Sequence, residues 1–331
     1  MLIKRKTCTI SLRWVCTPKI INGIPSIKAR LVAKGFQEQQ YVRGDSPTCS
    51  REGVKICLSI IASKSWTLRS LDISTAFLQG GPINREIYVV PPREAQTDKI
   101  WKLRKSVYGL NDASRQWYLR LREELINLGA TPIKLDQGIF CWYDNSNLVG
   151  VMVCFVDDIL YGGNCSFSDV ISIKQFNNSI VISQNDYVNN LEPISLTSVN
   201  TSNPNRPLVD IELTILRGAL GQLNWLSCIT RPEISFIVSE ISSRISSATV
   251  SDILSVNKTI KFVKSSPGFI TMPKLDLSSL RITAYSDSSF NNLPKGNSQG
   301  AHVVFLADDN NQSCPVSWSS NKVKRVVRST L

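Results

Sequence analysis

Two adjacent carboxylates follow an apolar run near the middle of the sequence. The segment LVGVMVCFV, residues 148–156, has no charged side chain and leads directly into Asp157 and Asp158. Two like charges at the end of a buried strand repel each other, and desolvation disfavours their charged forms. A bound divalent cation would remove that cost. The pair therefore indicates metal-dependent chemistry, and the plain alternative is a short acidic turn without a function.

A third carboxylate, Asp72, stands far upstream at the end of another expected strand. Residues 66–73 alternate between apolar and polar side chains, which is typical of a half-buried strand. Oxygen donors without histidine or cysteine suit Mg²⁺ or Mn²⁺. Two such ions about 3.5–4 Å apart can activate an attacking hydroxyl and stabilise the leaving oxygen of an in-line phosphoryl transfer. The three aspartates are therefore candidate metal ligands.

The surrounding sequence predicts the elements that would position these side chains. Residues 148–156 read as a buried strand that ends at a hairpin turn. Residues 14–36 read as a basic hairpin, and residues 51–63 as a helix. A further amphipathic helix is expected from its apolar spacing of four, with Asn111 and Asp112 as caps and Gly129 at its end; its apolar residues are Ala113, Trp117, Leu121 and Leu125.

The last part of the chain, from residue 195, reads as helices followed by strands. Residues 195–207 are rich in Ser, Asn and Pro and predict a linker or loop. The elements expected after it are helices near 209–227, 232–247 and 251–264, and strands in RITAYSD, AHVVFLAD and PVSWSS.

Composition restricts the class of protein. The 331 residues are 42% hydrophobic and 19% charged, which is typical of a folded globular chain. The net charge of +12 favours polyanionic partners such as nucleic acid or an anionic membrane surface. One histidine and nine cysteines without a CxxC pair argue against structural zinc, and the odd cysteine count argues against a disulfide framework. No secretory leader or membrane-spanning run is recognisable, so we expect an intracellular, reducing compartment.

Four segments together resemble one known family. LDISTAFLQG, IYVVPP, IWKLRKSVYGLNDASRQWY and FVDDILYGGN occur in the order and spacing of the reverse transcriptases in Pol polyproteins of copia-like LTR retrotransposons. WVCTPK and KARLVAKGFQEQ extend the resemblance upstream. LRGALGQLNWLSCITRPEISFIVSEIS resembles the segment between polymerase and ribonuclease H, and AYSDSSF and VSWSSNK look like opening strands of a ribonuclease H domain.

The resemblance implies a fold and an activity. The fold would be an α+β right-hand polymerase, with fingers and palm in 1–170, a reduced helical thumb and connection in 171–278, and a truncated ribonuclease H-like segment in 279–331. The activity would be RNA-directed DNA polymerisation with magnesium or manganese. The partners would be an RNA or DNA template with its primer and deoxynucleoside triphosphates, without a membrane, in cytoplasmic virus-like particles or the nucleus.

The resemblance also assigns roles to individual residues. Asp72, Asp157 and Asp158 would be the catalytic, metal-binding carboxylates, and Lys28 and Arg30 would contact the triphosphate of the incoming nucleotide. Taken alone, these two cations are more often solvated charges.

Three further residues would complete the nucleotide site. Phe77 would be an aromatic gate that excludes a 2′-hydroxyl, and Tyr108 and Gly109 would lie beside the nucleotide. Asp287 would be a remnant of the ribonuclease H site. The plain alternatives are that Phe77 packs the core, as we expect for Trp117, and that Asp287 caps a turn.

The chain departs from the family pattern in three places. Asn111 and Asp112 replace a basic and an amide residue, and a new carboxylate near a triphosphate would be repulsive unless it faces away. The segment between 163 and 182 is too short for the hairpin that holds the primer, whose loss would remove the positioning of the 3′-hydroxyl. The sequence stops before a second ribonuclease H carboxylate, so we expect no ribonuclease H activity.

These departures leave two rival functions open. One is a catalytically inactive retrotransposon relic that at most binds nucleic acid nonspecifically through its positive charge. The other is a two-metal nuclease that uses the same carboxylates and gives Phe77 no role.

Overall fold

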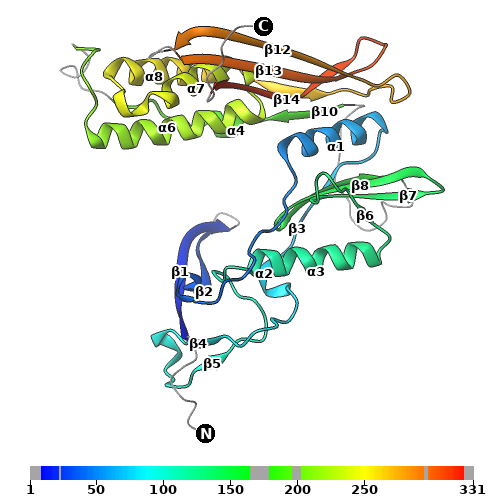
Figure 1. Cartoon of the computed structure of the whole chain (residues 1–331), viewed down its shortest axis with the longest axis vertical. Coiled ribbons are helices and arrows are strands. Elements are labelled where there is room, and N and C mark those ends of the chain that lie inside the picture. The colour runs from blue at the N-terminus through cyan, green and yellow to red at the C-terminus, as the bar shows by residue number, and fades with distance from the viewer. Residues whose placement is uncertain (1–8, 22–23, 165–178, 196–202, 294–296, 324–331) are drawn as a thin grey trace. The chain divides into compact units, whose positions relative to one another are not determined.

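The chain folds into two compact units, each of which mixes helices and strands (Figure 1). The first unit comprises Met1–Gly53 and Thr67–Lys174, and the second comprises Val54–Trp66 and Gln175–Leu331. Helix α1 (Arg51–Ser63), where the sequence predicts a helix, begins in the first unit and continues into the second. The computed structural model describes residues 9–21, 24–164, 179–195, 203–293 and 297–323.

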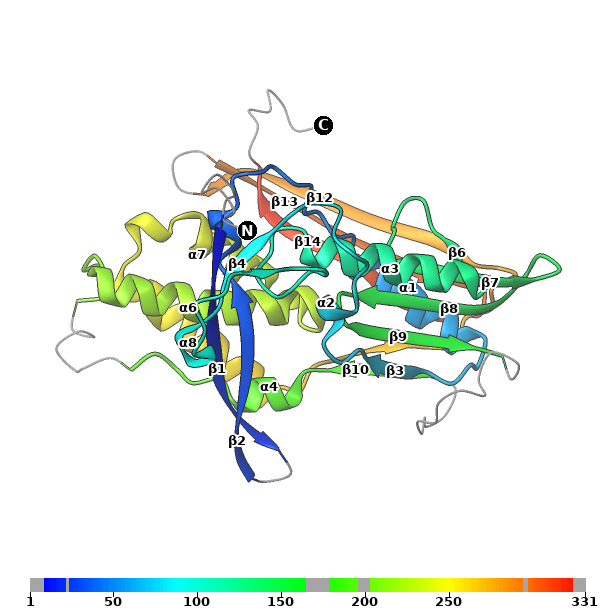
Figure 2. The same ribbon diagram turned by 90° about the horizontal axis from the view of Figure 1, so that it is seen from below.

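A five-stranded antiparallel sheet forms the centre of the first unit, in the strand order β3-β9-β8-β7-β6. Figure 2 shows β3, β9 and β8 side by side. The predicted strand at 148–156 is β8, whereas β3 is shorter than the alternation predicts. The strands are β3 (Arg69–Asp72), β6 (Thr131–Pro132), β7 (Ile139–Asp144), β8 (Asn147–Phe155) and β9 (Asp158–Gly163).

Helix α3 (Ala113–Asn127) packs on this sheet and confirms the predicted spacing of four. Its apolar face lies in one core with the fully buried Phe140 of β7. The helix ends before Gly129, whose φ of 85° is left-handed, as expected for a glycine there. Asp112 occupies the N-cap position, as predicted, but its side chain makes no capping hydrogen bond and binds Arg85 instead. The buried residues of this face are Ala113, Trp117, Tyr118, Leu121 and Leu125.

A second sheet of the first unit contains the predicted basic hairpin. Its strand order is β2-β1-β4-β5, and β1 pairs antiparallel with β2 and parallel with β4. The hairpin was predicted, but the parallel pairing was not. The strands are β1 (Thr9–Ile21), β2 (Ile24–Ala33), β4 (Tyr88–Val90) and β5 (Trp101–Lys102); the short helices of the unit are η1 (Gly35–Gln37), α2 (Ala76–Gln79) and η2 (Arg93–Ala95).

The second unit combines a helical cluster with two small antiparallel sheets. Helix α8 begins at the N-cap Thr249, whose backbone N–H donates to Asp252 at 2.8 Å. The helices of the second unit are α4 (Asn185–Asn189), α6 (Asp210–Ile229), η4 (Pro232–Ile234), α7 (Ser235–Ser243), η5 (Ile245–Ser247) and α8 (Val250–Ser265). The helix predicted over 232–247 is thus divided into three pieces.

The strands of the second unit are β10 (Ile180–Ser183), β11 (Phe269–Met272), β12 (Arg281–Leu293), β13 (Asn297–Ala307) and β14 (Ser313–Lys322). Three strands of the second unit, β12 to β14, lie where the sequence predicts strand character, whereas β10 and β11 were not predicted; helix α7 packs against β14. The central residues of the predicted linker, 196–202, lie outside the described residues.

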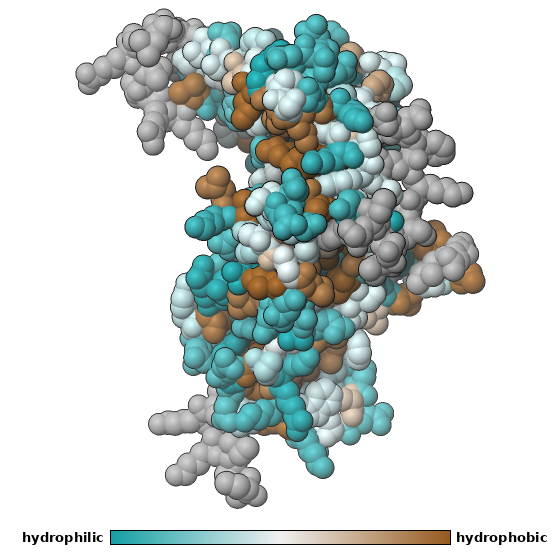
Figure 3. All heavy atoms as spheres, turned by 90° about the vertical axis from the view of Figure 1, so that its right-hand side faces the viewer, coloured by the Kyte–Doolittle hydropathy of each residue, from teal (hydrophilic) through white to brown (hydrophobic). Residues whose placement is uncertain are grey.

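Hydrophobic groups of side chains lie between hydrophilic ones on the face drawn in Figure 3. Within the described part of the chain, every helix is too short or too polar to cross a membrane.

Candidate functional site

The three predicted carboxylates lie together at one edge of the five-stranded sheet. Asp72, the last residue of β3, is the register partner of Asp158, the first residue of β9. Asp157 occupies the turn between β8 and β9, and its carbonyl accepts a hydrogen bond from the N–H of Ile73 at 3.0 Å. Residues directly opposite each other in such a pair have Cβ atoms about 4.5–5.5 Å apart. Asp72 and Asp158 are therefore close enough for their carboxylates to reach one ion.

All three carboxylates are exposed to solvent, which corrects one expectation. The sequence placed the acidic pair at the end of a buried strand, where desolvation would act on it. The strand is buried, but it ends before the pair, because β8 stops at Phe155 and the turn lifts Asp157 and Asp158 out of the core. Water thus reduces the repulsion between the two charges.

The carboxylates are suited to a divalent ion by type and by backbone position. In the described ranges, no three His, Cys, Asp or Glu side chains are gathered closely enough to hold a metal ion. The donor set around the turn consists of aspartate oxygens, which Mg²⁺ and Mn²⁺ prefer.

The turn that carries Asp157 has an unusual backbone. Val156 and Asp157 are its two central residues, since Phe155 pairs with Asp158. Val156 has a φ of 62°, whereas Asp157 is not among the residues with positive φ. A positive φ at the first central residue alone is the signature of a type II′ turn, where glycine is usual. A β-branched side chain in this region is strained.

A tryptophan holds this turn from the neighbouring helix. The indole N–H of Trp117, on α3, donates a hydrogen bond to the carbonyl of Val156 at 2.7 Å. The ring itself is buried in the core beneath the sheet, where Val156 also packs. The expectation that Trp117 is a core residue is confirmed, and the hydrogen bond adds a contact to the turn.

A cavity of ≈ 610 Å³ in the first unit brings most of the predicted site residues together. Lys28 and Arg30, two positions apart on β2, lie on its wall, and Asp72, Asp157 and Tyr108 complete it on other sides. Lys28 is exposed and Arg30 is half-buried. The cavity therefore combines a cationic wall with two of the three carboxylates.

Aromatic rings connect this wall to the core. The guanidinium of Arg30 lies 5.8 Å from the centre of the Tyr108 ring, and Tyr108 packs against Phe77 with ring centres 5.3 Å apart. Phe77 is not among the residues that line the cavity; it packs against two cores of the first unit. Of these two rings, Tyr108 reaches the cavity.

Gly109 allows the backbone of this segment to approach β2 closely. The N–H of Ala33 donates to the carbonyl of Tyr108 at 2.7 Å, and the N–H of Gly35 donates to that of Gly109 at 3.1 Å. Gly109 has a φ of 86°, and a Cβ atom there would lie 2.1 Å from the Ala33 carbonyl oxygen. Only glycine satisfies both conditions.

Asp112 faces away from the cavity and binds Arg85. The guanidinium donates two hydrogen bonds to Asp112, at 2.7 and 2.8 Å, and two to Glu38, at 2.7 and 3.3 Å. Burial raises the pKa of Asp112, but hydrogen bonds from Arg85 and Gln116 outweigh it and hold the pKa below its usual value. Asp112 in turn raises the pKa of Arg85. The carboxylate is thus neutralised by a buried partner and does not line the cavity.

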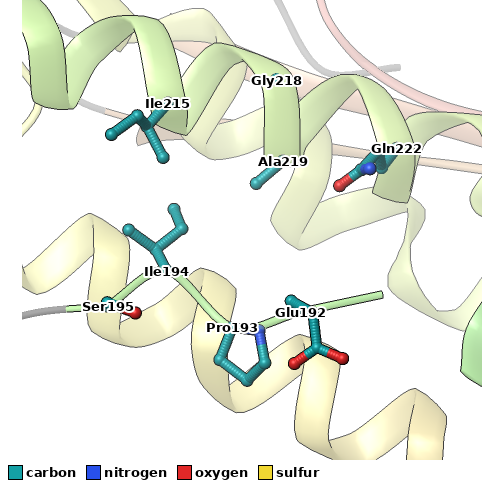
Figure 4. A pocket seen from close by; sticks show the side chains of 8 residues that line it. All are labelled: Glu192, Pro193, Ile194, Ser195, Ile215, Gly218, Ala219 and Gln222. Carbon is teal, nitrogen blue, oxygen red and sulfur yellow. The ribbon is translucent and has the colours of Figure 1, made fainter. Parts of the chain in front are cut away.

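Asp287 lies in the second unit, apart in sequence from the other candidates. It is an exposed residue of β12 and lines a cavity of ≈ 590 Å³ together with His302, whose Nδ1 is 3.1 Å from the Ser319 hydroxyl oxygen. Another cavity of the second unit, ≈ 450 Å³, separates α6 from residues 192–195 and contains none of the predicted site residues (Figure 4). The segment in which a primer-holding hairpin was expected to be missing includes 165–178, which lie outside the described residues.

The sequence of this site matches a known family. Residues 3–169, about half of the chain, match the family described as reverse transcriptase (RNA-dependent DNA polymerase), and they include all three aspartates and the residues of the cavity. The chain belongs to the reverse transcriptase family.

This reverse transcriptase chain is similar to the Pol polyproteins of copia-like retrotransposons over most of its length. It is 28% identical to the Retrovirus-related Pol polyprotein from transposon RE1 of Arabidopsis thaliana and 27% identical to that from transposon RE2, in both cases over 97% of the chain. It is 32% identical to the polyprotein from transposon TNT 1-94 of Nicotiana tabacum over 41% of the chain and 11% of that protein. The chain spans 24% of the length of the RE1 and RE2 polyproteins.

Three features around the site were not predicted from the sequence. The strain at Val156, the hydrogen bond from Trp117 to the turn and the pairing of Arg85 with Asp112 all depend on residues brought together by folding. For the third feature, the sequence offered one signal, the acidic residue Asp112 beside the start of a helix, which we interpreted as a cap.

Proposed function

We propose that this chain catalyses RNA-directed DNA polymerisation, in which a primer 3′-hydroxyl attacks a deoxynucleoside triphosphate. The register of Asp72 with Asp158, beside a cavity lined by Lys28 and Arg30, is the observation that carries the proposal. In this arrangement an acidic edge, which suits divalent ions, lies beside a cationic wall, which suits a triphosphate. Both lie in the residues that match the reverse transcriptase family.

The three aspartates would hold divalent metal ions, because reverse transcriptases in general use such ions. The ions, when bound, supply activation of the hydroxyl and stabilisation of the leaving phosphate oxygens. The protein's own contribution is to fix the carboxylates: Asp72 and Asp158 through the strand pairing, and Asp157 through the turn. Mutual repulsion of the unliganded carboxylates favours occupancy by a cation.

The cationic wall would bind and orient the triphosphate. Lys28 offers an exposed ammonium, while Arg30 is held by its contact with Tyr108 and can donate in a planar fork. Gly109 brings the segment that carries Tyr108 against β2. Phe77 stays a predicted sugar gate; it supports Tyr108, which lines the cavity, from the core side.

We infer a right-hand arrangement for the chain. The five-stranded sheet with α3 would be the palm, and the β1–β2 hairpin the fingers. The helices of the second unit would be the reduced thumb and connection, and β12–β14, with Asp287, the beginning of a ribonuclease H-like segment. Template and primer would be the partners, and the net charge of +12 supports binding to their phosphates.

Primer extension on an RNA template with Mg²⁺ tests this proposal. The parent chain should extend a DNA primer, and Asp157→Asn should abolish extension. Asp144→Asn is the matched control, because Asp144 is an exposed aspartate in the hairpin between β7 and β8 of the same sheet. Failure of the parent chain to extend would overturn the proposal and favour an inactive nucleic-acid binder. Degradation of unprimed RNA or DNA, lost in Asp157→Asn, would favour a nuclease.

A further inference from the structure

The turn between β8 and β9 is strained at one residue and held at both of its central carbonyls. The carbonyl of Val156 accepts the indole N–H of Trp117 at 2.7 Å, and the carbonyl of Asp157 accepts the N–H of Ile73 at 3.0 Å. The donors come from two different elements, helix α3 and the segment that follows β3. In a two-residue hairpin these carbonyls have no partner in the ladder of the hairpin itself, here β8 with β9, so both depend on donors from outside it.

The two held carbonyls belong to the two peptide groups that flank Asp157. One peptide group joins Val156 to Asp157, and the other joins Asp157 to Asp158. Because each peptide group is planar, fixing both of them fixes the backbone rotations of Asp157 and therefore the direction of its Cα–Cβ bond. The Ile73 contact is part of the strand pairing. The Trp117 contact is the one supplied by a side chain.

The strain at Val156 makes the contact with Trp117 consequential. A valine at φ 62° favours returning to negative φ, which would turn the preceding and following peptide groups and move Asp157. Val156 also packs on the same core as Trp117, and Trp117 is only 5% exposed, so the donor is rigidly placed. A rigid donor on a helix is well suited to holding a high-energy turn.

We propose that Trp117 is a positioning residue, which acts through the Val156 carbonyl to aim the Asp157 carboxylate at the shared ion. It touches neither substrate nor metal. The inference rests on the proposed polymerase function for its kinetic consequence, but its structural part, the holding of the turn, does not. Loss of the N–H should leave nucleotide binding in place and reduce the chemical step, because misplacement of a reacting group lowers rate more than affinity.

Trp117→Phe tests the proposal, because it removes the N–H and keeps an aromatic ring in the core. Tyr118→Phe is the matched control: Tyr118 is the next residue of α3, is also buried, and donates its hydroxyl to the Gln137 carbonyl at 3.1 Å, away from the turn. In primer extension by the full chain, Trp117→Phe should lower kcat roughly ten- to a hundredfold with little change in KM for the nucleotide. Tyr118→Phe should leave kcat within about twofold of the parent, with both variants assayed well below their melting temperatures, because Trp117→Phe also removes buried volume. Equal kcat values for the two variants would overturn the proposal.

A second measurement does not depend on activity. The sequence contains two Val–Asp peptide bonds, 156–157 and 209–210, so a full chain labelled with ¹³C′-valine and ¹⁵N-aspartate gives one carbonyl–amide NMR signal for each. Trp117→Phe should shift the 156–157 signal and leave the 209–210 signal unchanged, whereas Tyr118→Phe should shift neither. An unshifted 156–157 signal in Trp117→Phe would overturn the holding of the turn. If the parent chain fails to extend primers, the polymerase proposal fails while this measurement still decides the role of Trp117.

Replacement of the strained residue provides a rescue. Glycine adopts a φ of 62° without a steric penalty, so Val156→Gly should make the turn less dependent on its anchor. The loss of kcat caused by Trp117→Phe should therefore be smaller in the Val156→Gly background than in the parent. An equal loss in both backgrounds would show that Trp117 acts on the core and not on the turn.

Discussion

Replacement of Asp112 by asparagine should destabilise the first unit, because the buried Asp112 is the main partner of a half-buried arginine, Arg85. The side chains of Arg85, Glu38 and Asp112 are only 12%, 6% and 3% exposed. Asparagine keeps one oxygen for Arg85 and loses the other, together with the negative charge. A hydrogen bond to a charged group contributes about 1.5–3 kcal/mol, whereas leaving a buried charge without any partner costs about 3–5 kcal/mol. Because Glu38 still binds Arg85, we expect a loss of about 2–3 kcal/mol.

The expected loss is measurable by urea unfolding, followed by tryptophan fluorescence and circular dichroism in parallel. With a slope of about 2 kcal/mol per molar urea, the midpoint of the transition assigned to the first unit should fall by about 1 M. Asp45→Asn is the control, since Asp45 also binds an arginine, Arg43, but at an exposed position. It should leave the midpoint unchanged.

The stability that Asp112 contributes should depend on pH, and the direction of its pKa shift gives the sign of this dependence. The pKa of Asp112 is lower in the folded chain than its ordinary value, so the carboxylate stabilises the fold fully above about pH 4. This stabilisation is lost as the pH falls through the lowered pKa, because Asp112 then becomes protonated. The difference in midpoint between the parent and Asp112→Asn should therefore shrink below pH 4. An equal midpoint at pH 7, or a difference that does not change in acid, would refute the reasoning.

Three further predictions concern other parts of the first unit. Gly109→Ala should lower stability by at least about 2 kcal/mol and raise KM for the nucleotide, because its φ is positive and its Cβ would overlap the Ala33 carbonyl; Gly81→Ala, with open space around it, should do neither. Phe140→Ala should cost about 3–5 kcal/mol in urea unfolding, because Phe140 is fully buried in the core beneath the sheet, and a cost under about 1 kcal/mol would contradict this packing. Iodoacetamide at pH 8 should modify the exposed Cys16 but not Cys154 in the native chain, because burial raises the pKa of the Cys154 thiol to about 12; mass spectrometry showing equal labelling would contradict that burial.

Local patterns in the sequence predicted most of the elements that carry the site. Helix α3 follows from apolar residues spaced by four, and β8 from an uninterrupted apolar run, because both patterns express burial of one element against its neighbours. The position of Asp72 at the end of β3, and of Asp157 in a turn, followed from the same reasoning. These patterns arise from the burial of one face of a short segment, so they can be recognised in a single sequence.

Features that join distant segments could not be predicted in this way. The parallel pairing of β1 with β4 links residues nearly eighty positions apart, and the sequence of neither strand indicates which strand it pairs with. Asp112 was interpreted as a helix cap because aspartate favours that position. Its partner Arg85 lies 27 residues upstream, and a charge-assisted pair in a buried site outweighs a cap. The left-handed φ of Val156 contradicts the preference of valine and is determined by its surroundings.

We propose that Asp72, Asp157 and Asp158 meet around shared divalent ions. Fe²⁺ that replaces Mg²⁺ at such a site produces hydroxyl radicals and cuts the polypeptide near its ligands. With primer, template and nucleotide present, Fe²⁺ and ascorbate should cut the full chain both near Asp72 and near Asp157, and excess Mg²⁺ should suppress both cuts together. Cuts at only one of the two segments, or at neither while the chain is cut elsewhere, would contradict the claim that these carboxylates share a site.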